Sequence, residues 1–156
     1  ELFPLIRRLG IRFYAYNPLA GGLLSGKYKS VNDIPEDSSR FDTKLDSGKR
    51  YQGRYWKKHY FEAIEKLKAS AAEILPEKSL AEISLIWLHH HSQLQRDAFD
   101  AIIVGQSSPS HLHTNLYSGT QGSVSDNLLP DALIKAIDEA WEYVKPECPS
   151  YHPFTK

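Results

Sequence analysis

IRFYAYNPLAGGLLSGKY, residues 11–28, joins a short apolar run to a glycine-rich turn. The run is β-branched and aromatic and stops at the Asn17-Pro18 pair, which predicts a buried strand and a sharp turn. Glycines carry no Cβ atom, so a ligand could approach the backbone behind the turn. Free N–H groups and Lys27 would suit an anion such as a phosphate. A mobile glycine-rich surface loop is the alternative interpretation.

Residues 101–116, AIIVGQSSPSHLHTNL, repeat this order of buried strand, glycine, small polar residues and helix start. Ser108 is a plausible N-cap and Pro109 a plausible first helical residue. A helix N-terminus beyond a strand end attracts phosphate through its free N–H groups and its dipole. Two such strand ends suggest one anionic ligand between neighbouring βα loops, a recurring feature of (β/α)8 barrels.

The two stretches resemble the NADP(H)-dependent aldo-keto reductases, most closely the branch of aflatoxin aldehyde and succinic semialdehyde reductases. The segments RYWKKHYFE, HHHSQLQ and AWEYVKPECPSY also look like that branch. The resemblance covers nearly the whole chain but only the C-terminal half of the family's barrel. It implies an α/β fold, the C-terminal part of a (β/α)8 TIM barrel with strands seven and eight and their helices. We therefore expect one partial domain over residues 1–156, because two parallel strands cannot close a barrel.

Composition favours a soluble protein without a nucleic-acid or membrane partner. Nineteen basic and nineteen acidic residues cancel, and no apolar run approaches the roughly 20 residues that span a bilayer. The single cysteine, Cys148, permits no intrachain disulfide and suits a reducing compartment, so a cytoplasmic location is expected. The chain opens on Glu1 without Met, which agrees with a fragment, although a processed terminus would look the same.

Apolar periodicity predicts that residues 1–9 are the end of an amphipathic helix. It also predicts helices over residues 55–75, 79–94 and 130–144. The second of the three long helices starts with a capping box, Ser79-Leu80-Ala81-Glu82. The expected buried faces are Tyr60, Ile64, Leu67, Ala71 and Ile74; then Leu80, Ile83, Trp87 and Leu94; then Ile134, Ile137, Trp141 and Val144. Periodicity fails over residues 29–53, which predicts a long loop over the mouth of the cofactor and substrate site.

The resemblance implies a set of NADP(H)-binding residues. Tyr16 would stack on the nicotinamide, although a core tyrosine is the alternative. The loop behind it would wrap the pyrophosphate, Lys27 would pair with phosphate, and the fork of Arg40 suits a phosphate still better. The later stretch would hold the adenosine 2′-phosphate and the adenine. The full set is Tyr16, Asn17, Leu19, Ala20, Gly21, Lys27, Arg40, Gly105, Ser107, Ser108, His111 and Asn115.

Two positions depart from the family pattern, which usually has Gln at His111 and Glu at Thr114. A histidine can still donate to phosphate or stack on adenine. The missing acidic residue weakens the expected adenine contact.

Tyr51 and Arg54 match positions from which this branch contacts its substrate, and they could hold a distal carboxylate on a short aldehyde. The alternative is that Arg54 caps or pairs at the start of the long helix. In the family, hydride moves from the nicotinamide to the carbonyl carbon, and a tyrosine, lysine, histidine and aspartate supply and tune the proton. Those four come from the earlier strands, so we assign no catalytic residue in this chain.

No metal site is expected, because the adjacent residues His89, His90 and His91 point about 100° apart on a helix. Cys148 has no histidine partner nearby in sequence and is not expected to be a nucleophile. The predicted function is the cofactor-holding half of an NADPH-dependent reductase of aldehydes or ketones. A non-catalytic nucleotide-binding or regulatory fragment is the alternative, and a proteolytic remnant is a third. The expected partners are a small aldehyde and either the missing N-terminal half of the barrel or a second copy.

Overall fold

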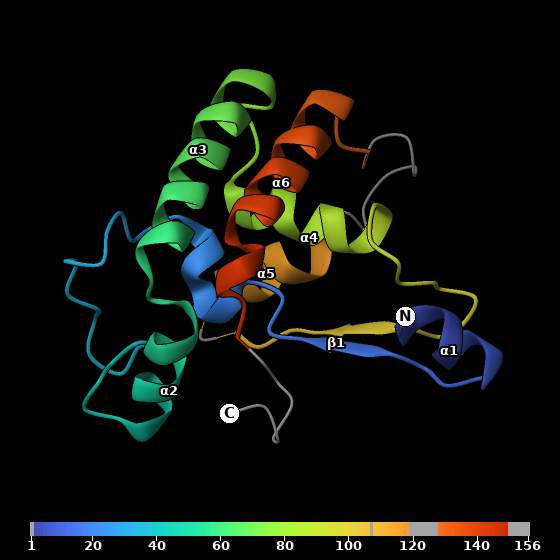
Figure 1. The fold of residues 1–156 in the computed structure, drawn as a ribbon, viewed down its shortest axis with the longest axis horizontal. Coiled ribbons are helices and arrows are strands. Elements are labelled where there is room, and N and C mark those ends of the chain that lie inside the picture. Colours follow the sequence, from blue (N-terminus) through green and yellow to red (C-terminus); the bar gives the residue numbers. More distant parts are fainter. Residues whose placement is uncertain (1, 107, 119–127, 150–156) are drawn as a thin grey trace. The chain divides into compact units, whose positions relative to one another are not determined.

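The computed structural model describes residues 2–106, 108–118 and 128–149, and the chain divides into two compact units (Figure 1). The first unit comprises residues 1–19 and 81–129, and the second comprises residues 20–80 and 130–156. The first contains α1 (Leu2–Arg8), β1 (Tyr14–Tyr16), α4 (Leu80–His90, from its second residue), β2 (Ala101–Ile103) and α5 (Pro109–Tyr117). The second contains the 3-10 segment η1 (Ala20–Ser25), α2 (Asp46–Tyr55), α3 (Lys58–Ile74), α6 (Asp131–Val144) and η3 (Lys145–Glu147).

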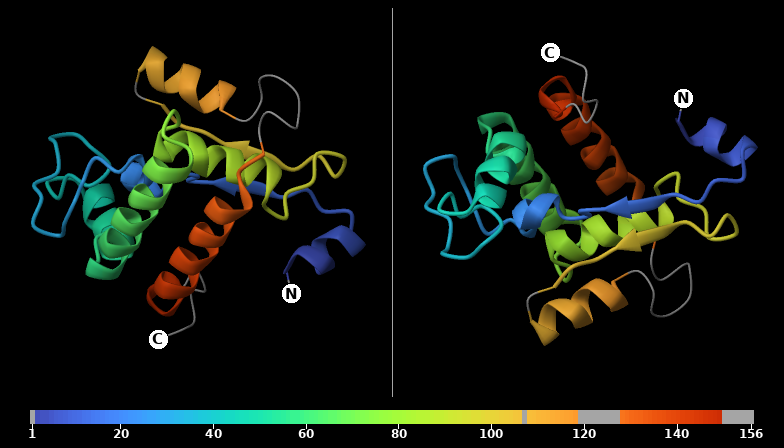
Figure 2. Two further views of the ribbon diagram at one scale, coloured as in Figure 1. Left: turned by 90° about the horizontal axis from the view of Figure 1, so that it is seen from above. Right: turned by 90° about the horizontal axis from the view of Figure 1, so that it is seen from below.

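The first unit is built on the two strands. They pair in parallel, with Tyr14 opposite Ala101 and Tyr16 opposite Ile103, which confirms the predicted neighbouring strands. Side chains alternate across a strand, so these four residues share one face. That face is exposed, so the prediction that both strands are buried is wrong for it. Ala15 and Ile102 point to the other face, along which α4 lies (Figure 2). The described part of the chain thus holds one two-stranded sheet, too few strands for a closed barrel.

Helix α4 is buried more broadly than predicted. Ile83, Leu85 and Ile86 are at most 1% exposed and Leu80 is buried, whereas Trp87 and Leu94 are only half-buried. The expected single stripe is therefore wrong in part. A helix that is apolar on most sides is buried on most sides.

The same helix ends at His90 instead of reaching residue 94. The Ser92 hydroxyl donates to the Leu88 carbonyl at 2.6 Å and accepts the Leu94 N–H at 3.2 Å. This local side-chain bonding replaces the helical pattern and turns the chain.

A buried carboxylate ties the beginnings of the two strands together. Asp100, whose side chain is 1% exposed, pairs with the Arg7 guanidinium and accepts the N–H groups of Phe13 (2.8 Å) and Gln95 (2.9 Å). Burial of Asp100 opposes its charge, but the Arg7 guanidinium and the two N–H groups outweigh burial and lower the pKa of the carboxyl to about 2. Sequence patterning did not single out this residue.

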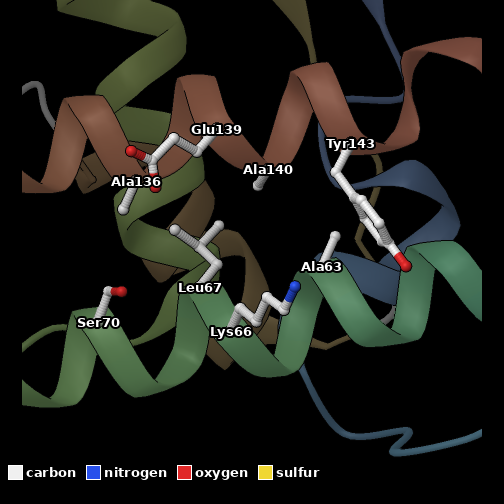
Figure 3. A pocket seen from close by; sticks show the side chains of 8 residues that line it. All are labelled: Ala63, Lys66, Leu67, Ser70, Ala136, Glu139, Ala140 and Tyr143. Carbon is white, nitrogen blue, oxygen red and sulfur yellow. The ribbon is translucent and has the colours of Figure 1, made fainter.

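In the second unit, α3 and α6 lie side by side (Figure 1). Small side chains, including Ala63, Ala136 and Ala140, line a shallow cavity of about 240 Å³ between them (Figure 3). Tyr143 on α6 closes one end, since its hydroxyl donates to the Glu62 carboxylate and its ring lies 4.8 Å from the Lys66 ammonium.

The buried faces of these two helices agree only in part with the predicted ones. On α3, Ile64, Leu67 and Ala71 are buried as predicted. On α6 the buried residues are Leu133 and Val144. Of the predicted face only Val144 is buried, and Trp141 is 48% exposed. Tyr60 and η3 add a contact on another side, because Lys57 donates to the Glu147 carbonyl at 2.8 Å and Tyr60 to the same oxygen at 3.4 Å.

The predicted loop over residues 29–53 is shorter than expected, because α2 begins at Asp46. Two hydrogen bonds and one close approach hold α2 against the loop. Gln52 donates to the Phe41 carbonyl at 3.0 Å, and the Leu45 N–H donates to the Asp42 carbonyl. Gly48 packs so closely on the Asp42 carbonyl that a Cβ there would lie 1.8 Å from its oxygen. The helix forms through tertiary contacts that its polar sequence does not reveal.

An aromatic cluster fixes the loop and also explains why the predicted helix over residues 55–75 starts only at Lys58. The ring of Phe41, 1% exposed, lies 5.8 Å from Tyr28 and 5.0 Å from Trp56. Trp56 also meets Phe61 at 5.0 Å and donates its indole N–H to the Val31 carbonyl at 3.0 Å. Holding Trp56 in the cluster leaves it outside both α2 and α3.

No helix in the described ranges has the length and apolar character to cross a membrane.

Candidate functional site

Within the first unit, the parallel pairing brings the carboxyl ends of both strands to one edge of the sheet. Tyr16 ends β1 there and is 56% exposed, so it is not a core tyrosine of this unit. Asn17 follows with φ 61°, a left-handed conformation that is uncommon outside glycine. Leu19 is half-buried, and Gly105, beyond β2, is exposed. Ligands of parallel sheets bind at this kind of edge.

The start of α5 confirms the predicted cap. The Ser108 hydroxyl accepts the His111 N–H at 3.2 Å and lies 3.0 Å from the Ser110 hydroxyl, and Pro109 is the first helical residue. His111 is exposed, whereas Asn115, one turn further on, is 9% exposed. Ser107 lies outside the described residues.

The second unit carries the glycine loop, which we define as residues 20–27. Ala20, Gly21, Gly22 and Gly26 all have φ between 50° and 97°. For Ala20 this conformation costs about 1–2 kcal/mol, and strain of this kind concentrates at ligand sites. Leu23, 1% exposed, anchors the loop, and Lys68 donates to the Gly26 carbonyl at 3.3 Å. Sequence reasoning found the glycines but had no signal for the strained alanine.

Lys27, at the end of the glycine loop, is paired within its own unit. Its ammonium lies 2.8 Å from the Glu36 carboxylate and 4.8 Å from the centre of the Tyr28 ring. Burial opposes the charge of Lys27, but Glu36 and Tyr28 outweigh burial and raise its pKa. The lysine therefore stays charged, and an arriving phosphate would exchange with Glu36.

Gly21, Arg40 and Tyr51 come together, although they are distant in sequence. The Arg40 guanidinium lies 5.7 Å from the centre of the Tyr51 ring. A Cβ on Gly21 would lie 2.5 Å from Tyr51 Cδ1, so only glycine fits there. Arg54 lies in the last turn of α2, before the long helix α3.

The residues present fit a phosphate-bearing dinucleotide. The glycine loop passes through left-handed positions at Ala20, Gly21 and Gly22, and the exposed Arg40 of the same unit lies over the Tyr51 ring that Gly21 also meets. The first unit, described by itself, has an exposed aromatic ring at a strand end and a capped helix N-terminus with an exposed histidine.

His89 and His91, at the end of α4 and just beyond it, make contacts within the first unit. The Leu129 N–H donates to His91 Nε2 at 3.0 Å, which holds Leu129 beside the end of α4. Burial lowers the pKa of His89, with Arg96 and His90 adding to the effect. In the described ranges, no three His, Cys, Asp or Glu side chains gather as metal ligands. Cys148 is exposed, and its sulfur lies 3.9 Å from the Tyr60 hydroxyl.

The chain is similar in sequence to known proteins over most of its length. The sequence profile of the aldo/keto reductase family matches residues 1–142. The chain is 43% identical over 97% of its length to human aflatoxin B1 aldehyde reductase member 2, of which it covers 41%. It is 42% identical over 97% of its length to human aldo-keto reductase family 7 member A3 and covers 45% of it. It is 35% identical over 93% of its length to an aldo-keto reductase of Pseudocercospora fijiensis and covers 46% of it.

The chain thus spans less than half the length of these relatives. The family profile nevertheless extends over most of the chain. Membership follows from that extent: the chain belongs to the aldo/keto reductase family, whose fold is the (β/α)8 barrel.

Proposed function

We propose that residues 1–156 are the cofactor-holding, C-terminal portion of an NADPH-dependent reductase of aldehydes or ketones. We call the barrel formed by this chain and the remaining strands, on the same or a second polypeptide, the full-length barrel. Family membership supports a reductase, and two relatives of 42–43% identity include one named as an aldehyde reductase.

The parallel register of β1 and β2 carries this proposal. It aligns Tyr16 with Ile103, so Tyr16, Asn17 and Gly105 follow the same edge of the sheet. A dinucleotide bound there would meet an aromatic ring from one strand end and a helix N-terminus from the other.

Within the full-length barrel, the residues of this chain bind and orient the cofactor, and the bound nicotinamide supplies the hydride. Tyr16 stacks on the nicotinamide, and the glycine loop and Lys27 hold the pyrophosphate. Arg40 binds a phosphate with its planar fork, and the Ser108 helix start with His111 binds the adenosine end. The proton donor and its partners belong to the strands outside this chain.

The experiment that tests this proposal compares cofactor affinities in the full-length barrel. Arg40→Ala removes a donor that only the 2′-phosphate of NADPH would use, so the dissociation constant of NADPH should rise about tenfold or more while that of NADH changes little. Such charge-assisted bonds are worth about 1.5–3 kcal/mol. Fluorescence titration measures both constants. Arg50→Ala, at another exposed arginine of the same unit, is the control, and equal losses of both cofactors would refute the assignment of Arg40.

We also propose that Arg54 favours aldehydes that carry a distal carboxylate. The side chain is half-buried in the last turn of α2, where its charge is less screened than in open water. In the full-length barrel, Arg54→Ala should raise KM for succinic semialdehyde far more than for an uncharged aromatic aldehyde. Equal changes for the two substrates would contradict this role.

A second candidate function is a nucleotide-binding or regulatory fragment without catalysis, because the chain is short compared with its relatives. It covers only 41% of human aflatoxin B1 aldehyde reductase member 2. The intact mass of the native protein decides between them. A mass matching a barrel of about 250 residues or more favours the reductase, and a mass near 17.8 kDa favours the fragment.

A further inference from the structure

The Tyr51 ring is the meeting point of three structural features in the second unit. Gly21 of the glycine loop lies against one part of the ring, so closely that a Cβ there would be 2.5 Å from Tyr51 Cδ1 and 2.8 Å from Cε1. The Arg40 guanidinium lies 5.7 Å from the ring centre. The third feature is the aromatic cluster, which reaches Tyr51 through Phe41 at 6.1 Å, edge to face.

The ring is fixed by that cluster. Phe41 is 1% exposed and Tyr55, whose ring lies 6.0 Å from that of Tyr51, is 8% exposed. Tyr51 itself is on α2, which Gln52 ties to the Phe41 carbonyl at 3.0 Å. A ring held by a helix and by buried neighbours has little freedom to move, because packed interiors leave few alternative rotamers.

The two groups that the ring contacts, by contrast, are of residue types with wide conformational freedom. Arg40 is an exposed side chain on an irregular segment, with many rotamers to lose when it binds a ligand. Gly21 has φ 72° and no side chain, so its conformation depends on what packs against it. A fixed aromatic face beneath both restricts them before any ligand arrives, and such preorganisation increases affinity. Arginine in particular stacks on aromatic faces.

We propose that Tyr51 is a positioning residue of the cofactor site, whose ring places Arg40 and the glycine loop for the phosphates of the cofactor. This inference rests on the proposed function and changes the role expected for Tyr51, from a substrate contact made by its hydroxyl to a cofactor-side support made by its ring.

Two substitutions separate the ring from the hydroxyl. In the full-length barrel, Tyr51→Phe keeps the ring and should leave the NADPH-to-NADH affinity ratio within about twofold, with KM for succinic semialdehyde unchanged. Tyr51→Leu removes the flat face and should lower that ratio at least fivefold. The double variant Tyr51→Leu/Arg40→Ala should have the same NADPH-to-NADH affinity ratio as Arg40→Ala, because the ring acts on this ratio only through Arg40. Tyr143→Leu, which removes an exposed ring on α6 that carries the Lys66 ammonium in the same unit, is the matched control and should leave the ratio near its original value.

A second measurement needs no cofactor. In the full chain of residues 1–156, Tyr51→Leu should increase the rate of trypsin cleavage after Lys27 and Arg40 severalfold, whereas Tyr51→Phe and Tyr143→Leu should not, since cleavage follows local opening. If Tyr51→Phe raises KM while Tyr51→Leu leaves both the affinity ratio and the cleavage unchanged, Tyr51 serves the substrate and the inference is wrong. If Arg40→Ala leaves the ratio unchanged but Tyr51→Leu still frees the two cleavage sites, the positioning holds and the proposed function fails instead.

Discussion

At the scale of single residues, the ion pair between Lys27 and Glu36 bears directly on the proposed phosphate site. Its side chains are 43% and 72% exposed, and exposed pairs contribute only about 0–1 kcal/mol. A cofactor phosphate should therefore displace Glu36, and Glu36→Gln should tighten NADPH binding by the full-length barrel by about two- to fivefold, given about 1.4 kcal/mol per factor of ten. Fluorescence titration measures the change.

Asp37→Asn is the control for that variant. Asp37 is the neighbouring loop carboxylate, pairs with Lys44 at 2.6 Å, and loses the same charge on substitution. Equal tightening by both variants would show that the general charge of the loop, and not the pair with Lys27, sets the affinity.

Asp100 gives the second prediction for a single residue, on stability against pH. Its folded pKa of about 2 lies below the usual value of about 3.9, so the folded state holds this proton less tightly than the unfolded state. The stabilisation is present above about pH 4 and is lost as the pH falls from about 4 to 2. Asp100→Asn should lower Tm at pH 7 and flatten the Tm profile over that acid range.

Thermal melts of residues 1–156 between pH 2 and 7 test this expectation. Asp97→Asn, an exposed carboxylate in the turn before β2, should follow the original profile. An unchanged acid slope in Asp100→Asn would assign the acid sensitivity to other groups.

Residues near one another in sequence were the most predictable part of the site. The Ser108 cap needs only its own turn, and the structure has the hydroxyl on the His111 N–H as expected. Lys27, Arg40 and Tyr51 were singled out, but their contacts were not predicted, because Glu36 meets Lys27, and Arg40 and Gly21 meet the Tyr51 ring, only after the loop folds. Asp100 escaped notice for the same reason, since Arg7 lies far from it in the sequence.

At the scale of elements, the segment over residues 29–45 is held by packing. Phe41→Ala would remove a ring that is 1% exposed and meets Tyr28, Tyr51 and Trp56. Buried Phe→Ala changes cost about 3–5 kcal/mol, so urea unfolding should show a loss of that size. Phe99→Ala, at a phenylalanine 67% exposed, should cost well under 1 kcal/mol. A small loss for Phe41→Ala would mean that the segment moves as a free lid.

Helix prediction succeeded where periodicity was strong and failed where tertiary contacts decide. Helix α3 was expected from its apolar spacing, with Ile64, Leu67 and Ala71 buried as predicted. Helix α2 was missed because its sequence, DSGKRYQGRY, contains two glycines and few apolar residues. Gly48 packs closely on the Asp42 carbonyl, and the sequence alone does not show that a glycine serves such a close approach.

At the scale of the whole molecule, the sequence predicted two parallel neighbouring strands, and the structure confirms the pair and adds its register. It also predicted that two strands cannot complete a barrel. Exposed Tyr14, Tyr16 and Ile103 on one face of the sheet agree with a surface that closed barrels cover. Which polypeptide supplies the remaining strands stays a prediction.

The last prediction concerns residues 1–156 by themselves: this chain should neither reduce aldehydes nor bind NADPH tightly. The tyrosine, lysine, histidine and aspartate that the family uses are expected on strands outside it. Only the pyrophosphate and adenosine ends of the cofactor would have partners here, on loops carried by strands of three residues each. Ordering such loops costs about 1–2 kcal/mol for each residue fixed, which their few contacts would not recover. NADPH titration by fluorescence and an oxidation assay with 2-carboxybenzaldehyde test both halves of the prediction, and micromolar binding or turnover above the uncatalysed rate would show that the chain is a working reductase without further strands.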